Sequence, residues 1–127
     1  MSTFPGRPVL GVHVRHIRQT SGPGQVAIVD VDFEPAADGV TIGVAADVDT
    51  GDYSFPEDVP RYVEALGEGV CAELAEIGAA PAVAVTVRRI RMHEVDSNEM
   101  AFTVAGRLAV REALRRDGDP SGPPDAR

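Results

Sequence analysis

The spacing of apolar residues changes abruptly after Asp49, and this change constrains the fold more than any other feature of the chain. Before it, apolar side chains occupy every second position over residues 25–34 and 40–48, as in strands that bury one face. After it, they recur at intervals of three or four, as in an amphipathic helix. The helical stripe consists of Val59, Val63, Leu66, Val70, Leu74 and Ile77. The chain therefore predicts strands followed by a covering helix.

Two further strands complete the sheet. Residues 9–18 are rich in β-branched side chains and precede a turn sequence at residues 21–24, while residues 82–92 return to alternation. The predicted order is β-β-β-α-β-α. We therefore expect an α+β fold, a two-layer sandwich whose first three strands form a meander and whose helices cover one face.

The second helix has the best-defined start in the sequence. Asp96 fits the N-cap position with Glu99 at N3, which together would form a capping box. Val95 and Met100 flank this box at the positions of a hydrophobic staple. We therefore predict that the helix begins directly after Asp96.

Two details of the pattern predict how the layers meet. Asp30, Asp32 and Glu34 share one face of their strand, and we expect that face to be exposed to solvent. Gly67 and Gly69 lie inside the first helix, where glycine lowers helix stability by about 1 kcal/mol relative to alanine. A neighbouring element is therefore expected to pack closely against these glycines.

The length of 127 residues allows one domain. We expect a flexible lead-in over residues 1–7, one folded domain over residues 8–116 and a disordered tail over residues 117–127. The tail is rich in proline, glycine and aspartate and has almost nothing to bury.

The charge of the chain limits its functional classes. It has 20 acidic residues against 12 basic ones, all of them arginine, for a formal net charge of -8. This balance excludes a uniformly basic nucleic-acid binder and a polybasic membrane tether, so we expect neither DNA nor a membrane as a partner. The chain lacks the lysine that a phosphate-binding loop requires and an apolar run of the roughly 18 residues that span a membrane. We expect a cytoplasmic protein without a cofactor.

The charges are also unevenly distributed. Residues 30–76 contain 13 acids and one arginine, whereas residues 88–116 contain seven arginines and four acids. Residues 1–25 contain three arginines and no acid. A surface divided in this way can present a local basic region to an anion although the whole chain is acidic.

Few residues suggest catalysis or metal binding. His13 and His16 are three apart on a strand and therefore lie on opposite faces, so they cannot chelate one metal. His93, Asp96 and Ser97 include the residue types of a nucleophilic triad, but no oxyanion donor is identifiable and helix capping explains Asp96. We expect no metal site and no enzymatic activity.

Two segments carry a family resemblance. The first contains Arg18-Gln19-Thr20, then Gly22, then Gly24-Gln25, and the second contains His93-Glu94-Val95-Asp96-Ser97 followed by Glu99-Met100-Ala101-Phe102. Both resemble loops of domain IV of the translocation factor elongation factor G, and the resemblance extends over roughly residues 10–116. It implies a fold like the second domain of ribosomal protein S5, with a left-handed β-α-β crossover.

The resemblance also implies a site. In the full factor these two loops lie side by side at a tip that enters the ribosomal decoding site beside tRNA and messenger RNA. The corresponding residues here are Arg18, Gln19, Thr20, Gly22, Gly24, Gln25 and His93. If the chain binds RNA, we expect Arg18 to contact phosphate and Gln25 and His93 to hydrogen-bond to RNA. Since the whole chain is acidic, arginines 88, 89 and 91 are the further positive charges available beside Arg18.

The chain departs from the family pattern at several positions. Ser21 replaces a glycine, Pro23 replaces the loop arginine, Val26 replaces an aromatic residue and Glu57 replaces a lysine.

Two hypotheses for the function follow. The first hypothesis is a non-catalytic module that binds ribosomal RNA or tRNA without a GTPase domain. The alternative is a repurposed protein-interaction domain that keeps the scaffold but does not bind RNA. For Gly22-Pro23-Gly24, an ordinary hairpin turn and an RNA-contacting loop both remain open.

Overall fold

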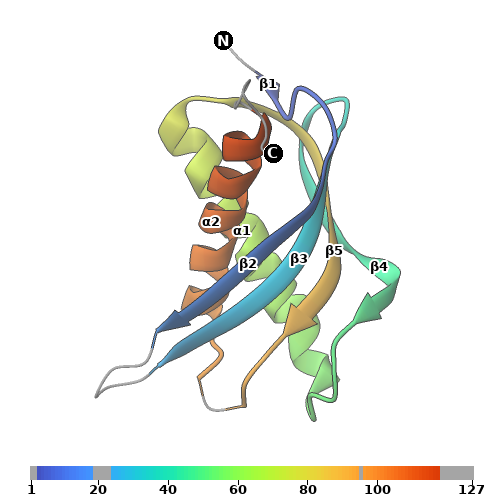
Figure 1. The fold of residues 1–127 in the computed structure, drawn as a ribbon, viewed down its shortest axis with the longest axis vertical. Coiled ribbons are helices and arrows are strands. Elements are labelled where there is room, and N and C mark those ends of the chain that lie inside the picture. Colours follow the sequence, from blue (N-terminus) through green and yellow to red (C-terminus); the bar gives the residue numbers. More distant parts are fainter. Residues whose placement is uncertain (1–2, 19–23, 95, 118–127) are drawn as a thin grey trace.

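The computed structural model describes residues 3–18, 24–94 and 96–117 of the chain (Figure 1). Two helices lie together on one side of a curled sheet, so the chain forms the predicted two-layer α+β sandwich. The elements are β1 (Thr3–Phe4), β2 (Val9–Arg18), β3 (Gln25–Pro35), β4 (Gly39–Asp49), the 3-10 turn η1 (Pro56–Asp58), α1 (Val59–Ile77), β5 (Ala80–Arg91) and α2 (Glu99–Asp117).

The limits of α1 follow from local chemistry. Pro60 lies in its first turn, where the missing N–H has no intrahelical partner to lose. Gly78 ends the helix in the left-handed conformation, at φ 73°, which glycine adopts without steric cost. None of the described helices is long and apolar enough to cross a bilayer.

The predicted meander is wrong, because β5 and not β4 lies beside β3. β5 pairs antiparallel with β3 and parallel with β4, so Val83 is opposite Pro35 on one side and Val40 on the other. Ala36 donates its backbone N–H to the carbonyl of Ala82 at 2.8 Å, which diverts the chain away from β3 before β4 begins. Alternation in the sequence identifies the buried face of a strand but not its neighbours. The helix α1 connects the parallel pair β4 and β5.

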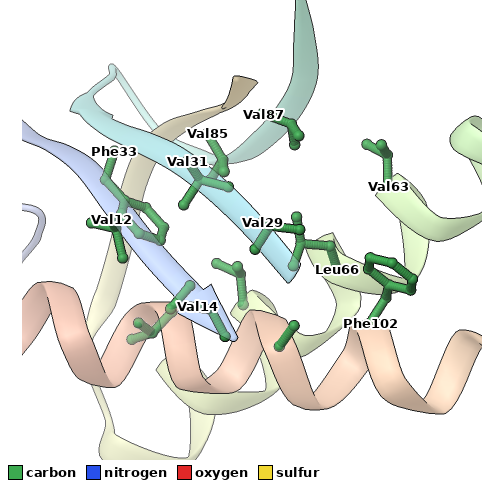
Figure 2. Packing of buried hydrophobic residues seen from close by; sticks show 14 of the residues in the cluster. Val12, Val14, Val29, Val31, Phe33, Val63, Leu66, Val85, Val87 and Phe102 are labelled. Atoms are coloured by element: carbon green, nitrogen blue, oxygen red, sulfur yellow. The ribbon is translucent and has the colours of Figure 1, made fainter. Parts of the chain in front are cut away.

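The core lies between the sheet and the helices. Ala27, Val29, Val31 and Phe33 of β3 are all fully buried, as the alternation predicts. Figure 2 shows valines of β2 and β3 pointing into the same layer as Leu66 of α1 and Phe102 of α2. In the sandwich α2 packs on β2 and β3, while α1 packs on β4 and β5.

The expected close packing at the glycines of α1 is confirmed. A Cβ atom added to Gly67 would lie 3.1 Å from Cγ2 of Ile42 in β4. A Cβ atom added to Gly69 would overlap the backbone of Thr103 in α2. The two glycines therefore allow α1 to approach the sheet with one side and α2 with the other.

The acidic face of β3 is not uniformly exposed. Asp32 is only 7% exposed, because it accepts hydrogen bonds from the backbone N–H of Gly11 and from Nε of Arg88, each at 2.8 Å. The register of β2 against β3 shifts between Val9 and Val12, and Gly11 there adopts φ 65°. This bulge turns the Gly11 amide toward Asp32, so the expectation of a fully exposed face is wrong at this residue.

The lead-in expected over residues 1–7 contributes to the core. Thr3 and Phe4 pair with Ala80 and Pro81 as strand β1. The Phe4 side chain is 2% exposed, and its ring lies 5.2 Å from that of Phe33 in an edge-to-face arrangement. The prediction of a flexible segment is therefore wrong for these two residues. The tail predicted to start at Asp117 falls, from residue 118 onward, outside the described residues.

Candidate functional site

The start of β3, residues 24–26, contacts the segment before α2, residues 96–98, at one end of the molecule. Val26 donates its backbone N–H to the carbonyl of Asp96 at 3.1 Å, and the Asn98 side chain reaches the carbonyl of Gly24 at 3.5 Å. The expected adjacency is therefore confirmed for the described ends of the two loops. We call this end the tip and define it by Arg18 and residues 24–26, 93–94 and 96–98.

Ser97 joins the two loops and is only 8% exposed. Its hydroxyl donates to the carbonyl of Val26 and accepts from the backbone N–H of His93, both at 2.7 Å. Its own N–H donates to the carbonyl of His93 at 2.9 Å. Because the Ser97 proton is directed to a backbone carbonyl, this hydroxyl has no general base, and the triad interpretation loses its nucleophile.

Helix α1 contacts the tip through Tyr62. The hydroxyl of Tyr62 donates to the carbonyl of Ser97 at 3.2 Å, and the Tyr62 ring stacks on Phe102 with centroids 4.6 Å apart. Tyr62 is 3% exposed, so the contact is dry. The tip is thus fixed to both helices as well as to the sheet.

The predicted N-cap at Asp96 is wrong by two residues. Helix α2 begins at Glu99, and the Asn98 side chain accepts the backbone N–H of Ala101 at 2.8 Å, as an N-cap does. The cap falls at Asn98 because Ser97 is held in the bridge to β3 and cannot enter the helix. Met100 is 60% exposed, and Val95 lies outside the described residues, so the staple stays a prediction.

Asp96 instead contributes to the shape of the tip. Its Oδ1 occupies the space that a Cβ atom at Gly24 would need, at 2.9 Å. Its Oδ2 lies 3.7 Å from Nδ1 of His93, and its N–H donates to that same nitrogen at 3.1 Å. The absence of a side chain at Gly24 thus leaves room for the carboxylate of the opposite loop, a contact that the sequence alone does not reveal.

His93 lies at the tip with its ring partly exposed. Its side chain is 55% exposed, and Nδ1 accepts the N–H of Asp96. Since Nδ1 is an acceptor here, the neutral ring carries its proton on Nε2. The imidazole is thus oriented as a hydrogen-bond donor at the tip.

His16 is a tip-proximal residue that sequence reasoning missed. Its Nε2 lies 2.8 Å from Oε1 of Gln25, so the Gln25 carbonyl is occupied and its amide NH₂ is the group turned to other partners. The sequence does contain an indication of this position: side chains alternate between the two faces of a strand, so His16 and Arg18 share one face of β2.

The arginines near the tip differ in their partners. Arg18 is exposed, and across the described ranges its side chain makes no ion pair or hydrogen bond. The β5 arginines expected to support Arg18 are each paired with a carboxylate, so their support stays a prediction. The pairs are Arg88 with Asp32 at 2.8 Å, Arg89 with Asp30 at 3.8 Å and Arg91 with Asp49 at 2.9 Å.

The pair between Arg91 and Asp49 is reinforced by the backbone. Asp49 accepts from Arg91 and from the N–H of Gly51, and these hydrogen bonds lower its pKa to about 2. Arg91 also donates to the backbone carbonyl of Asp49 at 3.0 Å. The Arg91 guanidinium is therefore occupied by Asp49, the last residue of β4, and is a poor candidate for phosphate binding.

Three residues of the predicted site, Gln19, Thr20 and Gly22, lie outside the described residues, as do Ser21 and Pro23. Their roles stay predictions. In the part of the chain that the structure covers, no three His, Cys, Asp or Glu side chains are arranged to hold a metal ion.

The fold and the tip define a class of protein: a two-layer α+β domain in which the start of β3 is hydrogen-bonded to the connection between β5 and α2. Residues 5–117 match the family described as elongation factor G, domain IV, and the chain belongs to this family.

The relatives are much longer than this chain. It is 36% identical over 126 residues to elongation factor G 2 of Streptomyces coelicolor, which covers 89% of this chain and 17% of that protein. It also resembles a crystal structure of a protein from Thermus thermophilus, with a TM-score of 0.57 and 25% identity over 80% of this chain and 16% of the other. The chain thus spans about a sixth of the length of these proteins, at 17% and 16%.

Proposed function

We propose that this chain is a non-catalytic module that binds the RNA of the ribosome through its tip and acts in translation in the cytoplasm. The observation that carries the proposal is the hydrogen-bonded connection between the two loops, centred on Ser97. It holds His93 beside the start of β3, where the Gln25 side chain is oriented by His16. Donors that are fixed before binding lose little conformational entropy when they engage a partner.

The charge of the molecule determines how such binding behaves. With a net charge of -8 the chain is repelled by phosphate, but salt limits this repulsion to about one Debye length, roughly 8 Å. Arg18 is exposed at the end of β2, whereas the arginines of β5 are neutralised by Asp30, Asp32 and Asp49. Binding is therefore weak and salt-sensitive, and it depends on the tip. Each phosphate contact contributes about 0.7 to 0.9 to the slope of log affinity against log salt.

The experiment is co-sedimentation with purified ribosomes over a range of salt concentrations. We expect the parent chain to pellet with ribosomes at low salt and the variant Arg18→Ala/His93→Ala to remain in the supernatant. The matched control is Arg15→Ala/His13→Ala, which removes an exposed arginine and an exposed histidine from the same strand away from its tip end and should pellet like the parent. Thermal melts establish that both variants are folded.

The alternative function is a protein-interaction domain that has lost RNA binding. The observation in its favour is the pairing of every β5 arginine with a carboxylate, which leaves little positive charge beside Arg18. A parent chain that fails to pellet at low salt would exclude the ribosomal proposal and favour this alternative. A parent that pellets together with an equally competent tip variant would place the RNA contact elsewhere on the molecule.

A further inference from the structure

Strand β4 has an open edge away from the tip. Among the described strands β4 pairs only with β5, so its other side is unpaired, and Figure 1 shows it at the margin of the sheet. Residues 39–44 contain no charged side chain and no proline, and Val44 is 45% exposed. Natural edge strands are commonly protected by lysine, proline or an inward-pointing charge, and this stretch has none of these devices.

A groove runs beside this edge, between β4 and α1. It consists of two hollows of about 340 Å³ and about 350 Å³ that share Ile42 and Glu64 in their linings. One continues to Val44 and Pro60, and the other continues to Glu68. We call the combined feature the β4 groove.

The β4 groove is apolar on its strand side and acidic on its helix side. Glu64 and Glu68 are one helical turn apart on α1, and within the described residues neither makes an ion pair. They belong to the region of residues 30–76, which carries 13 acids and one arginine. The charge therefore selects a cationic occupant.

Other occupants are less compatible with this surface. A second copy of the chain would bring the same two glutamates and another net charge of -8 to the interface. The chain's own residues 118–127 contain two aspartates and three prolines, and proline cannot donate to a strand ladder.

We propose that the β4 groove binds an extended peptide segment of a partner protein in which lysine or arginine alternates with apolar residues. The segment adds a strand to the open edge of β4 through backbone hydrogen bonds, as in β-strand addition. Side chains on its inner face lie along the hollows, with their aliphatic stems on Ile42 and their charged ends at Glu64 and Glu68. This site is separate from the tip and does not depend on RNA binding.

The test uses the peptide acetyl-Arg-Val-Arg-Val-Arg-Val-amide and the ¹⁵N-labelled full chain. We expect saturable changes in the amide resonances of residues 40–44 and 64–71 and none at the tip. The peptide acetyl-Glu-Val-Glu-Val-Glu-Val-amide should not bind. The cationic peptide with alternate backbone amides N-methylated keeps its charge but loses the ladder, and it should lose at least ten-fold in affinity.

Variants of the chain localise the contact. Glu64→Gln/Glu68→Gln should weaken the cationic peptide about five-fold, since two exposed ion pairs are lost. The matched control Glu34→Gln/Glu99→Gln removes two exposed glutamates elsewhere and should bind like the parent. Val44→Lys adds the missing edge charge and should abolish binding while thermal melts show a folded chain.

Four outcomes would overturn the proposal. They are equal binding of the acidic peptide, equal binding of the N-methylated peptide, resonance changes confined to the tip, and a parent chain that elutes as a dimer whose contacts map to β4. The last outcome would identify the occupant as a second copy of this chain.

Discussion

Gly69 of α1 and Gly106 of α2 face each other where the two helices cross. A Cβ atom added to Gly106 would lie 3.1 Å from the Cα of Gly69 and would overlap the carbonyl oxygen of Leu66. One added to Gly69 would overlap the carbonyl of Thr103. Backbone therefore packs directly against backbone at this crossing, with no side chain that could move aside.

The variant Gly106→Ala should lower the free energy of unfolding by about 1–3 kcal/mol or more, because the added methyl group forces the helices apart. The matched control is Gly43→Ala, where an added Cβ meets nothing within 4 Å and the backbone is not left-handed. Urea denaturation of the two variants and the parent gives the comparison. Equal losses at both positions would contradict the close helix crossing.

Asn98→Ala should lower the free energy of unfolding by about 1 kcal/mol, because the N–H of Ala101 loses its capping acceptor. Asp96→Ala removes a carboxylate that does not cap the helix and should cost less. Thermal melts of both variants show whether Asn98 or Asp96 is the N-cap of α2. A larger loss for Asp96→Ala would restore the capping box that the sequence suggests.

Ser97→Ala should cost about 1–3 kcal/mol, because the carbonyl of Val26 and the N–H of His93 would both lose a partner in a buried site. The control Ser54→Ala changes an exposed serine and should leave stability unaltered. Hydrogen exchange provides a local readout: the amide of Val26 should exchange faster in the Ser97 variant. Unchanged exchange there would show that the loops are held together without this bridge.

Glu73 should make stability depend on pH. Its side chain is buried and accepts from Arg111 and Arg107, each at 3.0 Å, and the bond to Arg111 above all lowers its pKa below the ordinary value of 4.5. A carboxyl whose pKa is lowered by folding stabilises the native state fully above 4.5, and this contribution is lost as the pH falls below that value.

The variant Glu73→Gln should therefore cost about 1–3 kcal/mol at neutral pH, where two arginines lose a charged acceptor. Urea melts of parent and variant from pH 7 to pH 3 should show the difference shrinking toward the acid end. A difference that stays constant over this range would exclude the ionised carboxylate as its source.

Local pattern predicted the elements well. The alternation over residues 25–34 identified the buried face of β3, and the stripe from Val59 to Ile77 identified α1. These features depend on residues a few positions apart, whose geometry the backbone period determines.

Features that depend on distant partners could not be predicted in this way. The burial of Asp32 needs Arg88, which is 56 positions away, and the place of β5 in the sheet needs Val83 to pair with two strands at once. At the tip, the sequence motifs identified the two segments that form it. They did not predict that Asn98 caps α2, because this depends on the hydrogen bond of Ser97 to Val26, 71 positions away. The strand from Thr3 to Phe4 is too short to produce a recognisable period.

The central position of β5 makes folding a late event in synthesis. Strands β1, β3 and β4 all pair with residues 80–91, so a nascent chain that ends before Ala80 can form only the β2–β3 hairpin within the sheet. Until β5 leaves the ribosomal tunnel, β4 has no strand to pair with, and α1 lacks part of the sheet surface on which it packs. Most stabilising contacts thus form across long sequence separations, which favours slow and concerted folding over growth from the amino terminus.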